Sequence, residues 1–340
     1  MRLATVVVGV VLALVVAELA LRVAWTEETR SQSEPIPERL RGLPQLRGVL
    51  ALGHPNTRGV YKGVLHQTNS AGFRGREYGV AKPPGTFRIA VLGDSVTMGS
   101  GVDAKQTYSA MLERTLNATR DDYDYEVLNF GVAGLNLNVI VTERLQKIAV
   151  SFRPDLLIYG FTVNDIEGPH YRRFERTYTM ADEERGGSLL LGLVRQRWRY
   201  TRELMWPAPG SYVYELDENY FRNAAAWQFF LADLGRLAEV ASELGVCTQV
   251  LIHTKLYALG SLHPFTRHYD RVAEAARAHD LHVTFSLPHF LGEDHRSLWV
   301  SPANAHPNAD GHRRMATALL EGLEAMPPEC WVRRPAGGGR

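Results

Sequence analysis

The alternation of short apolar runs with helical periodicity is the feature that most constrains the fold of this chain. It begins after Pro83-Pro84-Gly85, where five runs have the apolar content of buried strands: residues 87–92, 126–130, 156–161, 246–253 and 282–287. Apolar residues at helical spacing follow each run, within residues 106–118, 137–148, 227–244, 267–279 and 315–323. Strands that alternate with helices are joined by right-handed crossovers, so the sequence predicts an α/β fold whose five-stranded parallel sheet is covered on both faces.

The residues that follow the predicted strands are those of acyl-transfer chemistry. Sheets of this kind bind ligands outside the carboxyl ends of their strands. Ser95 follows the first strand, Gly134 lies in the loop after the second, and Asn164 follows the third. His306 precedes the last helix, because Pro307 suits the first helical turn and leaves the histidine on the preceding loop. A hydroxyl, an imidazole, a backbone N–H and an amide are the nucleophile, base and oxyanion donors that acyl transfer needs.

Several other classes of protein are excluded. The chain has 38 Lys and Arg against 37 Asp and Glu, which argues against a nucleic-acid binder. Thr97 occupies the second glycine position of a GxSxG elbow, and no P-loop occurs. The two cysteines, Cys247 and Cys330, form no zinc motif. A buried thiol in a strand is the favoured interpretation of Cys247, and a bridge to Cys330 is the alternative. We expect no cofactor and no metal.

Four short blocks in this order resemble those of the SGNH (GDSL-type) hydrolase family. They are GDS at Ser95, NFGVAG at Gly134, GFTVND at Asn164 and HPN at His306. The earlier segment TNSAGFRG, residues 68–75, resembles what precedes the first block in membrane-anchored members. The resemblance implies a flavodoxin-like three-layer α/β/α sandwich over residues 87–326. It also implies esterase or lipase chemistry without metal or cofactor.

The same resemblance assigns roles to these residues. Ser95 is the expected nucleophile and His306 its general base. The backbone N–H groups of Ser95 and Gly134, with the Asn164 side chain, are the expected oxyanion hole, and loss of one such donor typically costs about 3 to 4 kcal/mol of transition-state stabilisation.

One position departs from the family pattern. The family usually has an aspartate three residues before the histidine, where this chain has Ala303, and the next position holds Asn304. A triad aspartate fixes the histidine tautomer and stabilises the imidazolium. Asp294 is a conceivable substitute and Asp310 a weaker one. A Ser95–His306 pair assisted by Asn304 or by a backbone carbonyl is also possible.

Three functions are therefore considered. The first is a serine esterase that acts through an acyl-enzyme on Ser95, on an acetylated glycan or lipid of the cell envelope. The second is a non-catalytic acyl- or glycan-binding pseudoenzyme that has lost the triad aspartate. The third is an O-acyltransferase that uses the same serine.

The N-terminus predicts a membrane segment. Residues 3–17 carry no charge, and the apolar character continues to Trp25 with Glu18 and Arg22 as the charged residues. As a helix, residues 3–25 would measure about 35 Å, enough to cross a hydrocarbon core of roughly 30 Å. A signal anchor at residues 1–25 is favoured over a cleaved signal peptide or a buried soluble helix. We expect a single-pass protein of the cell membrane with an extracytoplasmic globular domain.

The remaining segments are assigned from composition. Residues 26–86 are predicted to be a linker and pre-core segment, with regular structure beginning after Pro84. Residues 167–210 break the strand and helix alternation and form an arginine-rich insert, either a lid or membrane-facing helix or an ordinary packed insertion. Residues 327–340 are predicted to be a flexible tail.

Overall fold

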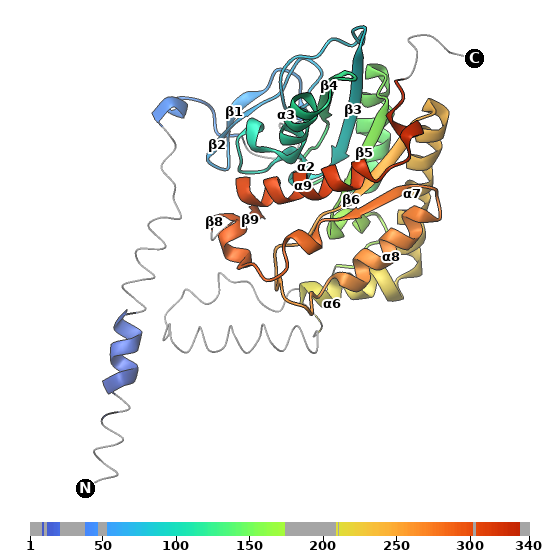
Figure 1. Cartoon of the computed structure of the whole chain (residues 1–340). Helices are drawn as coiled ribbons and strands as arrows, with labels where there is room; N and C mark the ends of the chain where they lie inside the picture. The colour runs from blue at the N-terminus through green and yellow to red at the C-terminus, as the bar shows by residue number, and fades with distance from the viewer. Residues whose placement is uncertain are drawn as a thin grey trace. The chain divides into compact units, whose positions relative to one another are not determined.

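A five-stranded parallel sheet lies at the centre of the fold, in the order β4-β3-β5-β6-β7 (Figure 1). The strands are β3 (Thr86–Gly93), β4 (Asp124–Asn129), β5 (Leu156–Phe161), β6 (Cys247–Ile252) and β7 (His282–Phe285). Every neighbouring pair is parallel. The first strand of the core, β3, thus lies between the second, β4, and the third, β5. This is the flavodoxin-like order, and it confirms the predicted fold class.

The computed structural model describes residues 9, 12–20, 38–46, 53–173, 209, 211–301 and 304–333. The chain divides into two units, Met1–Pro35 with Arg172–Glu218, and Ile36–Tyr171 with Asn219–Arg340. The second unit holds the sheet and all the motif residues. In the first unit, α6 (Tyr212–Asp217) begins at Ser211, whose hydroxyl accepts from the Tyr214 N–H.

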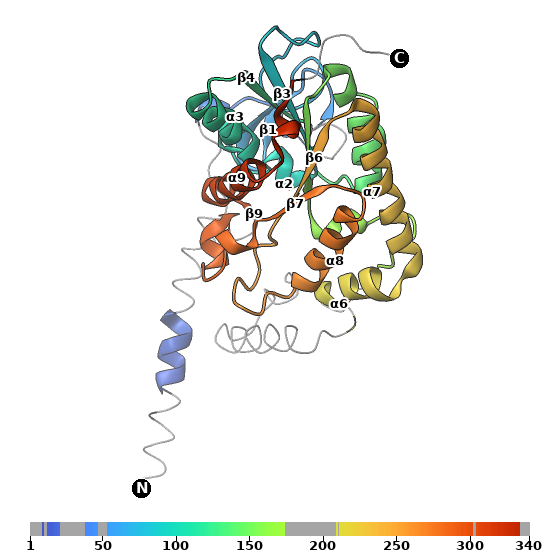
Figure 2. The ribbon, with the colours of Figure 1, turned by 45° about the vertical axis from the view of Figure 1, so that its right-hand side comes forward.

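Helices cover both faces of the sheet (Figure 2). On one face, α3 (Tyr108–Thr119) and α9 (Ala309–Glu324) pack on apolar side chains of β3, β5 and β6. On the other lie α7 (Ala224–Leu244) and α8 (Thr266–Arg277). Local sequence explains the helix ends: the side chains of Thr107, Asn223 and Asn308 cap α3, α7 and α9, and Gly245 ends α7 in the left-handed conformation.

Short elements complete the described structure. They are α2 (Ser95–Met98), η1 (Glu38–Leu40), η3 (Ala104–Gln106), η6 (Val163–Ile166), η8 (Glu218–Arg222), η9 (Leu287–His289), η10 (His295–Leu298) and η11 (Pro328–Trp331). The predicted helix over 137–148 is irregular: α4 (Leu137–Val139) continues as the π-helix η4 (Ile140–Leu145), and η5 (Ala149–Phe152) follows.

Two predictions about the flanks of the core were wrong. Regular structure begins before Pro84, because β1 (Arg58–Tyr61) and β2 (Val64–Gln67) form an antiparallel hairpin. His306 and Pro307 lie in β9 (Asn304–Pro307), which pairs with β8 (Trp299–Ser301), and the last helix begins at Ala309 behind the Asn308 cap. In both places, pairing between strands overrode the expectation of a loop.

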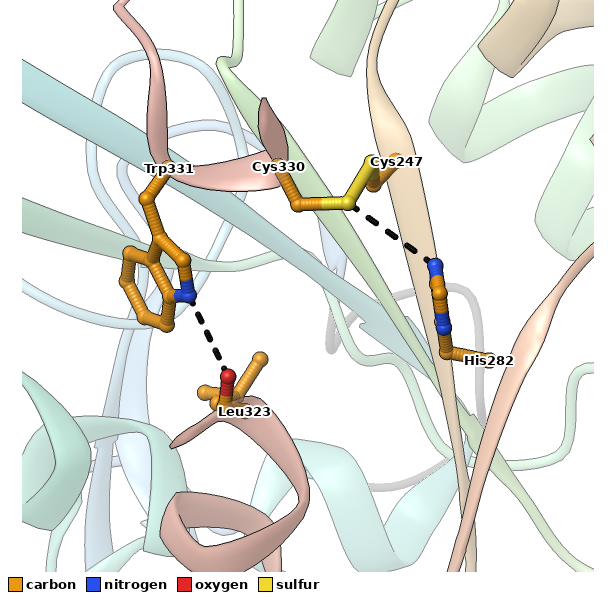
Figure 3. The surroundings of a disulfide bond; sticks show 5 residues. All are labelled: Cys247, His282, Leu323, Cys330 and Trp331. Carbon is orange, nitrogen blue, oxygen red and sulfur yellow. Dashed lines mark hydrogen bonds between the residues drawn. A yellow bond between two sulfur atoms is a disulfide. The ribbon is translucent and has the colours of Figure 1, made fainter. Parts of the chain in front are cut away.

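A disulfide joins the start of β6 to the C-terminal segment (Figure 3). Cys247 and Cys330 are bonded, with their Cα atoms 5.4 Å apart, so the favoured interpretation of Cys247 as a thiol was wrong. Cys330 lies in η11, within the segment 327–340 predicted to be a flexible tail. The Trp331 indole donates to the Leu323 carbonyl at 3.2 Å, which also holds this segment on α9.

The predicted membrane segment lies mostly outside the described residues. Residues 12–20 are helical, and no helix among the described residues is long and apolar enough to cross a membrane. Most of the insert at 167–210 is likewise outside them.

Candidate active site

Ser95 is presented on the turn between β3 and α2. Asp94 caps α2, since its Oδ1 accepts from the Val96 N–H at 2.9 Å. A Cβ atom on Gly93 would collide with Thr97, and one on Gly131 would collide with the backbone of α2. These glycines allow the ends of β3 and of the β4 loop to approach the helix closely. The serine is therefore held at the carboxyl edge of the sheet.

The structure brings Ser95, His306 and Asn304 together in a hydrogen-bonded line. The Ser95 Oγ lies 2.9 Å from His306 Nε2. The other ring nitrogen, Nδ1, lies 2.6 Å from Asn304 Oδ1. Because an amide oxygen only accepts, Nδ1 carries the proton and Nε2 is left to accept from the serine hydroxyl. This is the tautomer that a general base requires.

The two aspartates considered as substitutes for the triad carboxylate have other partners. Asp294 caps η10, where its Oδ1 accepts from the Arg296 N–H at 3.0 Å. Asp310 pairs with Arg313 and Arg314. Within the described part of the chain, no carboxylate hydrogen-bonds to His306.

Positive charge surrounds His306 instead. The Lys62 ammonium lies 3.3 Å from Nδ1. Burial, followed by the charges of Lys62 and Lys255, lowers the pKa of His306 to about 3. The imidazole is thus neutral, and able to accept a proton, well below the pH at which an ordinary histidine becomes charged.

The buried carboxylates of Asp94 and Asp165 form a hydrogen-bond network beside the turn that carries Ser95. Asp94 Oδ2 accepts from the Thr162 hydroxyl at 3.1 Å and from the Asn164 amide at 3.3 Å. Asp165 accepts from the Thr162 N–H at 3.0 Å and from the Tyr159 hydroxyl at 2.6 Å. Burial raises the pKa of both aspartates, and the charge of Asp94 adds to the effect on Asp165. The network ties the end of β5 to the turn after β3.

The predicted oxyanion donors lie on the loops expected of them. Gly134 follows β4 with φ of +78°, a conformation that favours glycine. Asn164 lies in η6 after β5, and its amide points to Asp94. Their role as donors to an oxyanion stays a prediction.

Two site residues were missed in the sequence. The Arg74 guanidinium is buried and donates to the carbonyls of Met98, Gly99, Val102 and Leu65 at 2.6 to 3.1 Å. It thereby fastens the end of α2 to the β1–β2 hairpin. Burial lowers the pKa of Arg74 to about 10, and Asp103 opposes this. The resemblance of residues 68–75 to a family segment was the signal that could have pointed to Arg74. Lys62 lies within residues 26–86, which were predicted to be a linker and pre-core segment.

One group among the described residues has metal-ligand spacing. The ligand atoms of Cys247, His282 and Cys330 lie within 4.8 Å of one another. The two sulfurs are bonded to each other, so they do not offer thiolates (Figure 3).

A family comparison agrees with this geometry. The model of the GDSL-like Lipase/Acylhydrolase family matches residues 91–314, which include Ser95, Gly134, Asn164 and His306. The chain belongs to this family. It is therefore an ester-bond hydrolase of the GDSL type, an esterase or acyl hydrolase.

Three solved structures illustrate what this GDSL-type hydrolase is similar to. TesA is 18% identical, over 70% of this chain and 98% of TesA, with a TM-score of 0.43. An acetylxylan esterase, Axe2 of Geobacillus stearothermophilus, is 16% identical, over 73% and 97%, with a TM-score of 0.45. A two-domain esterase active on acetylated mannans is 16% identical, over 75% of this chain and 53% of its own, with a TM-score of 0.45. No curated protein matches the sequence.

Proposed function

We propose that this GDSL-type hydrolase cleaves an acyl ester through an acyl-enzyme on Ser95, with His306 as general base. The observation that carries the proposal is the 2.9 Å contact between Ser95 Oγ and His306 Nε2, with Nδ1 held by Asn304. These two linked contacts support the proposal because acyl-transfer chemistry uses a nucleophile, a base and an orienting group in this order.

In this mechanism the serine proton moves to Nε2 as Oγ attacks the ester carbonyl. The Ser95 and Gly134 N–H groups and the Asn164 amide would stabilise the oxyanion. Burial, followed by the charges of Lys62 and Lys255, lowers the pKa of His306, so the resulting imidazolium is a strong acid and readily returns the proton to the departing alkoxide. Water then attacks the acyl-enzyme with His306 again as base, which releases the acid and restores the serine. Asn304 acts as a positioning residue for His306.

A fluorophosphonate probe tests the nucleophile. We expect full-length protein to be labelled at Ser95, located by peptide mass spectrometry, and to hydrolyse p-nitrophenyl acetate. Ser95→Ala should abolish both while the protein stays folded. Ser151→Ala is the matched control, because this serine is exposed and its hydroxyl bonds to the Ile148 carbonyl. Turnover that survives Ser95→Ala would contradict the mechanism.

For the substrate, we propose an acetylated glycan or lipid of the cell envelope. The names of two similar structures, an acetylxylan esterase and an esterase active on acetylated mannans, support a short acyl group on a carbohydrate. Acetate release from acetylated glycans, compared with fatty acid release from phospholipids, would separate the two. Product analysis with a sugar acceptor would detect transfer in place of hydrolysis.

For the location, we propose that the N-terminal segment anchors the hydrolase in the cell membrane with the catalytic unit outside the cytoplasm. The uncharged run at residues 3–17 supports this proposal. The full-length protein should stay in the membrane pellet after alkaline carbonate extraction, and protease added to intact spheroplasts should digest it. Release by carbonate, or protection from the protease, would refute the arrangement.

A further inference from the structure

Lys62 occupies a turn position that suits a lysine poorly. It and Gly63 form the two-residue connection between β1 and β2, with φ values of +48° and +78°. A connection with positive φ at both residues favours Asn, Asp or Gly at its first position, because any Cβ is strained there and the short polar side chains of Asn and Asp can hydrogen-bond to the local backbone. The hairpin itself therefore gives no reason for a lysine.

The lysine side chain reaches the catalytic histidine. Its ammonium lies 3.3 Å from His306 Nδ1 and 5.5 Å from the centre of the Tyr61 ring. Nδ1 already donates its proton to Asn304 Oδ1 at 2.6 Å, so the ammonium has no acceptor in the imidazole. Lys62 forms no ion pair with any residue in the described ranges. Lys62 is exposed, so a ligand can reach its ammonium group.

A second lysine adds to this positive field. Lys255 is exposed on the segment that follows β6. Its charge contributes to the lowered pKa of His306, after burial and Lys62, and it partly opposes the rise that burial causes in the pKa of Asp94. Two lysines from distant parts of the chain thus both act on His306. Partial burial also lowers the pKa of Lys62, a cost that an anionic partner would offset.

The chemistry of the reaction indicates which portion of the ester lies near Lys62. His306 Nε2 returns its proton to the departing alkoxide, so the alcohol portion of the substrate lies on the His306 side of the scissile bond. Lys62 contacts this same imidazole at its other nitrogen, Nδ1. The acyl portion is bound by the serine on the other side of the scissile bond.

We propose that the ester cleaved at this site carries an anionic group, a carboxylate or a phosphate, on its alcohol portion, and that Lys62 binds this group with Lys255 adding to the attraction. The inference rests on the proposed function of Ser95 and His306. The bound anion also neutralises the charge beside the imidazole, so the substrate supplies negative charge where the chain has Asn304 in place of a carboxylate.

Small aryl acetates test the proposal with a matched pair. The anionic probe is 3-acetoxybenzoate, and its neutral counterpart of nearly the same shape is 3-acetoxybenzamide. Each kcat/KM is divided by the hydroxide-catalysed rate of the same ester, which removes the difference in leaving group. We expect a normalised ratio of about 10 or more in favour of the anion, falling as NaCl is raised from about 0.02 to about 0.5 M because the lysines are exposed.

Variants assign this preference to Lys62. Lys62→Gln should bring the ratio close to 1, and Lys62→Arg should retain most of it. Lys147→Gln is the matched control, because that exposed lysine pairs with Glu143 at 2.7 Å, and it should leave the ratio unchanged. The probe 3-acetoxyphenyl phosphate distinguishes the two anions: a higher normalised rate than the benzoate indicates a phosphate ester substrate, and a lower one a carboxylate.

Failure of this inference differs from failure of the proposed function. A wild-type ratio of 1 or less, or a ratio that Lys62→Gln leaves intact, overturns the inference while Ser95-dependent hydrolysis of p-nitrophenyl acetate still stands. Absence of that hydrolysis in folded protein overturns the proposed function, and this inference with it.

Discussion

Replacing Asn304 by aspartate should change the pH dependence of the hydrolase in a defined direction. The substitution keeps the shape of the side chain and places a carboxylate 2.6 Å from His306 Nδ1, where the amide oxygen now lies. At present the pKa of His306 is lowered to about 3, by burial and then by Lys62 and Lys255. A neutral base therefore persists at acid pH, and kcat/KM should stay level down to about pH 5.

The size of the change follows from the charge separation. Two unit charges about 4 Å apart interact by about 4 kcal/mol at an effective dielectric of 20. That energy corresponds to about 3 pKa units at about 1.36 kcal/mol per unit. Burial of the new carboxylate opposes part of it, so we expect the acid limb of kcat/KM to move up by about 2 pH units. Because the imidazolium is stabilised as it forms, the plateau should rise by about 10-fold.

The assay is p-nitrophenyl acetate hydrolysis from pH 4 to 8, with near-UV circular dichroism at each pH to show that the protein is folded. Asn304→Ala is the control for loss of the acceptor without gain of charge. It should lower the plateau, since the productive tautomer is no longer held, and leave the acid limb low. An Asn304→Asp profile whose acid limb coincides with that of wild type would refute the electrostatic account of His306.

Three further predictions concern stability. Arg74→Met should lower the free energy of unfolding in urea by about 4 kcal/mol, because four carbonyls, three of them in buried hydrogen bonds, lose their donor. A loss below about 1 kcal/mol would contradict the role of Arg74 in fastening α2 to the hairpin. Cys330→Ser opens a disulfide across 83 residues and should cost about 4 kcal/mol, with kcat/KM of the folded protein unchanged at 25 °C; lost activity in folded protein would be unexpected. Burial lowers the pKa of His253 and His312 to about 3, from 6.5. The unfolded chain then binds more protons, so stability should fall as pH drops below 6.5, by about 1.4 kcal/mol per pH unit for each histidine. A midpoint of thermal unfolding that stays constant from pH 7 to pH 5 would count against this. So would a midpoint that depends on pH as steeply in His253→Phe as in the wild type.

The strand and helix pattern predicted much of the fold, for a physical reason. Buried parallel strands need continuous apolar runs and their covering helices need apolar stripes, so both leave a local signature. The run at residues 156–161 coincides with β5, and that at 87–92 lies within β3. The irregular helix after residue 137 shows the limit. Its apolar spacing indicated a helix, but such spacing does not distinguish the π-helical backbone of η4 from an α-helix.

The positions of the site residues could be predicted from sequence where a residue follows the end of a strand. Ser95 and Asn164 follow strands directly, so the sheet alone brings them to one edge. The partner of His306 Nδ1 was left open among Asn304, two aspartates and a backbone carbonyl, because sequence does not show which way a side chain turns. The pairing of β8 with β9 decides it by holding Asn304 and His306 on the same short strand.

By itself, then, the sequence determined the α/β class, the order of the elements and the four blocks of an ester hydrolase, because these depend on local periodicity and on residues next to strand ends. Tertiary structure alone decided what surrounds them. It set Lys62 against His306 across 244 residues of chain and bonded Cys247 to Cys330 across 83. Contacts of that range arise from sheet order and core packing, and no local propensity encodes them.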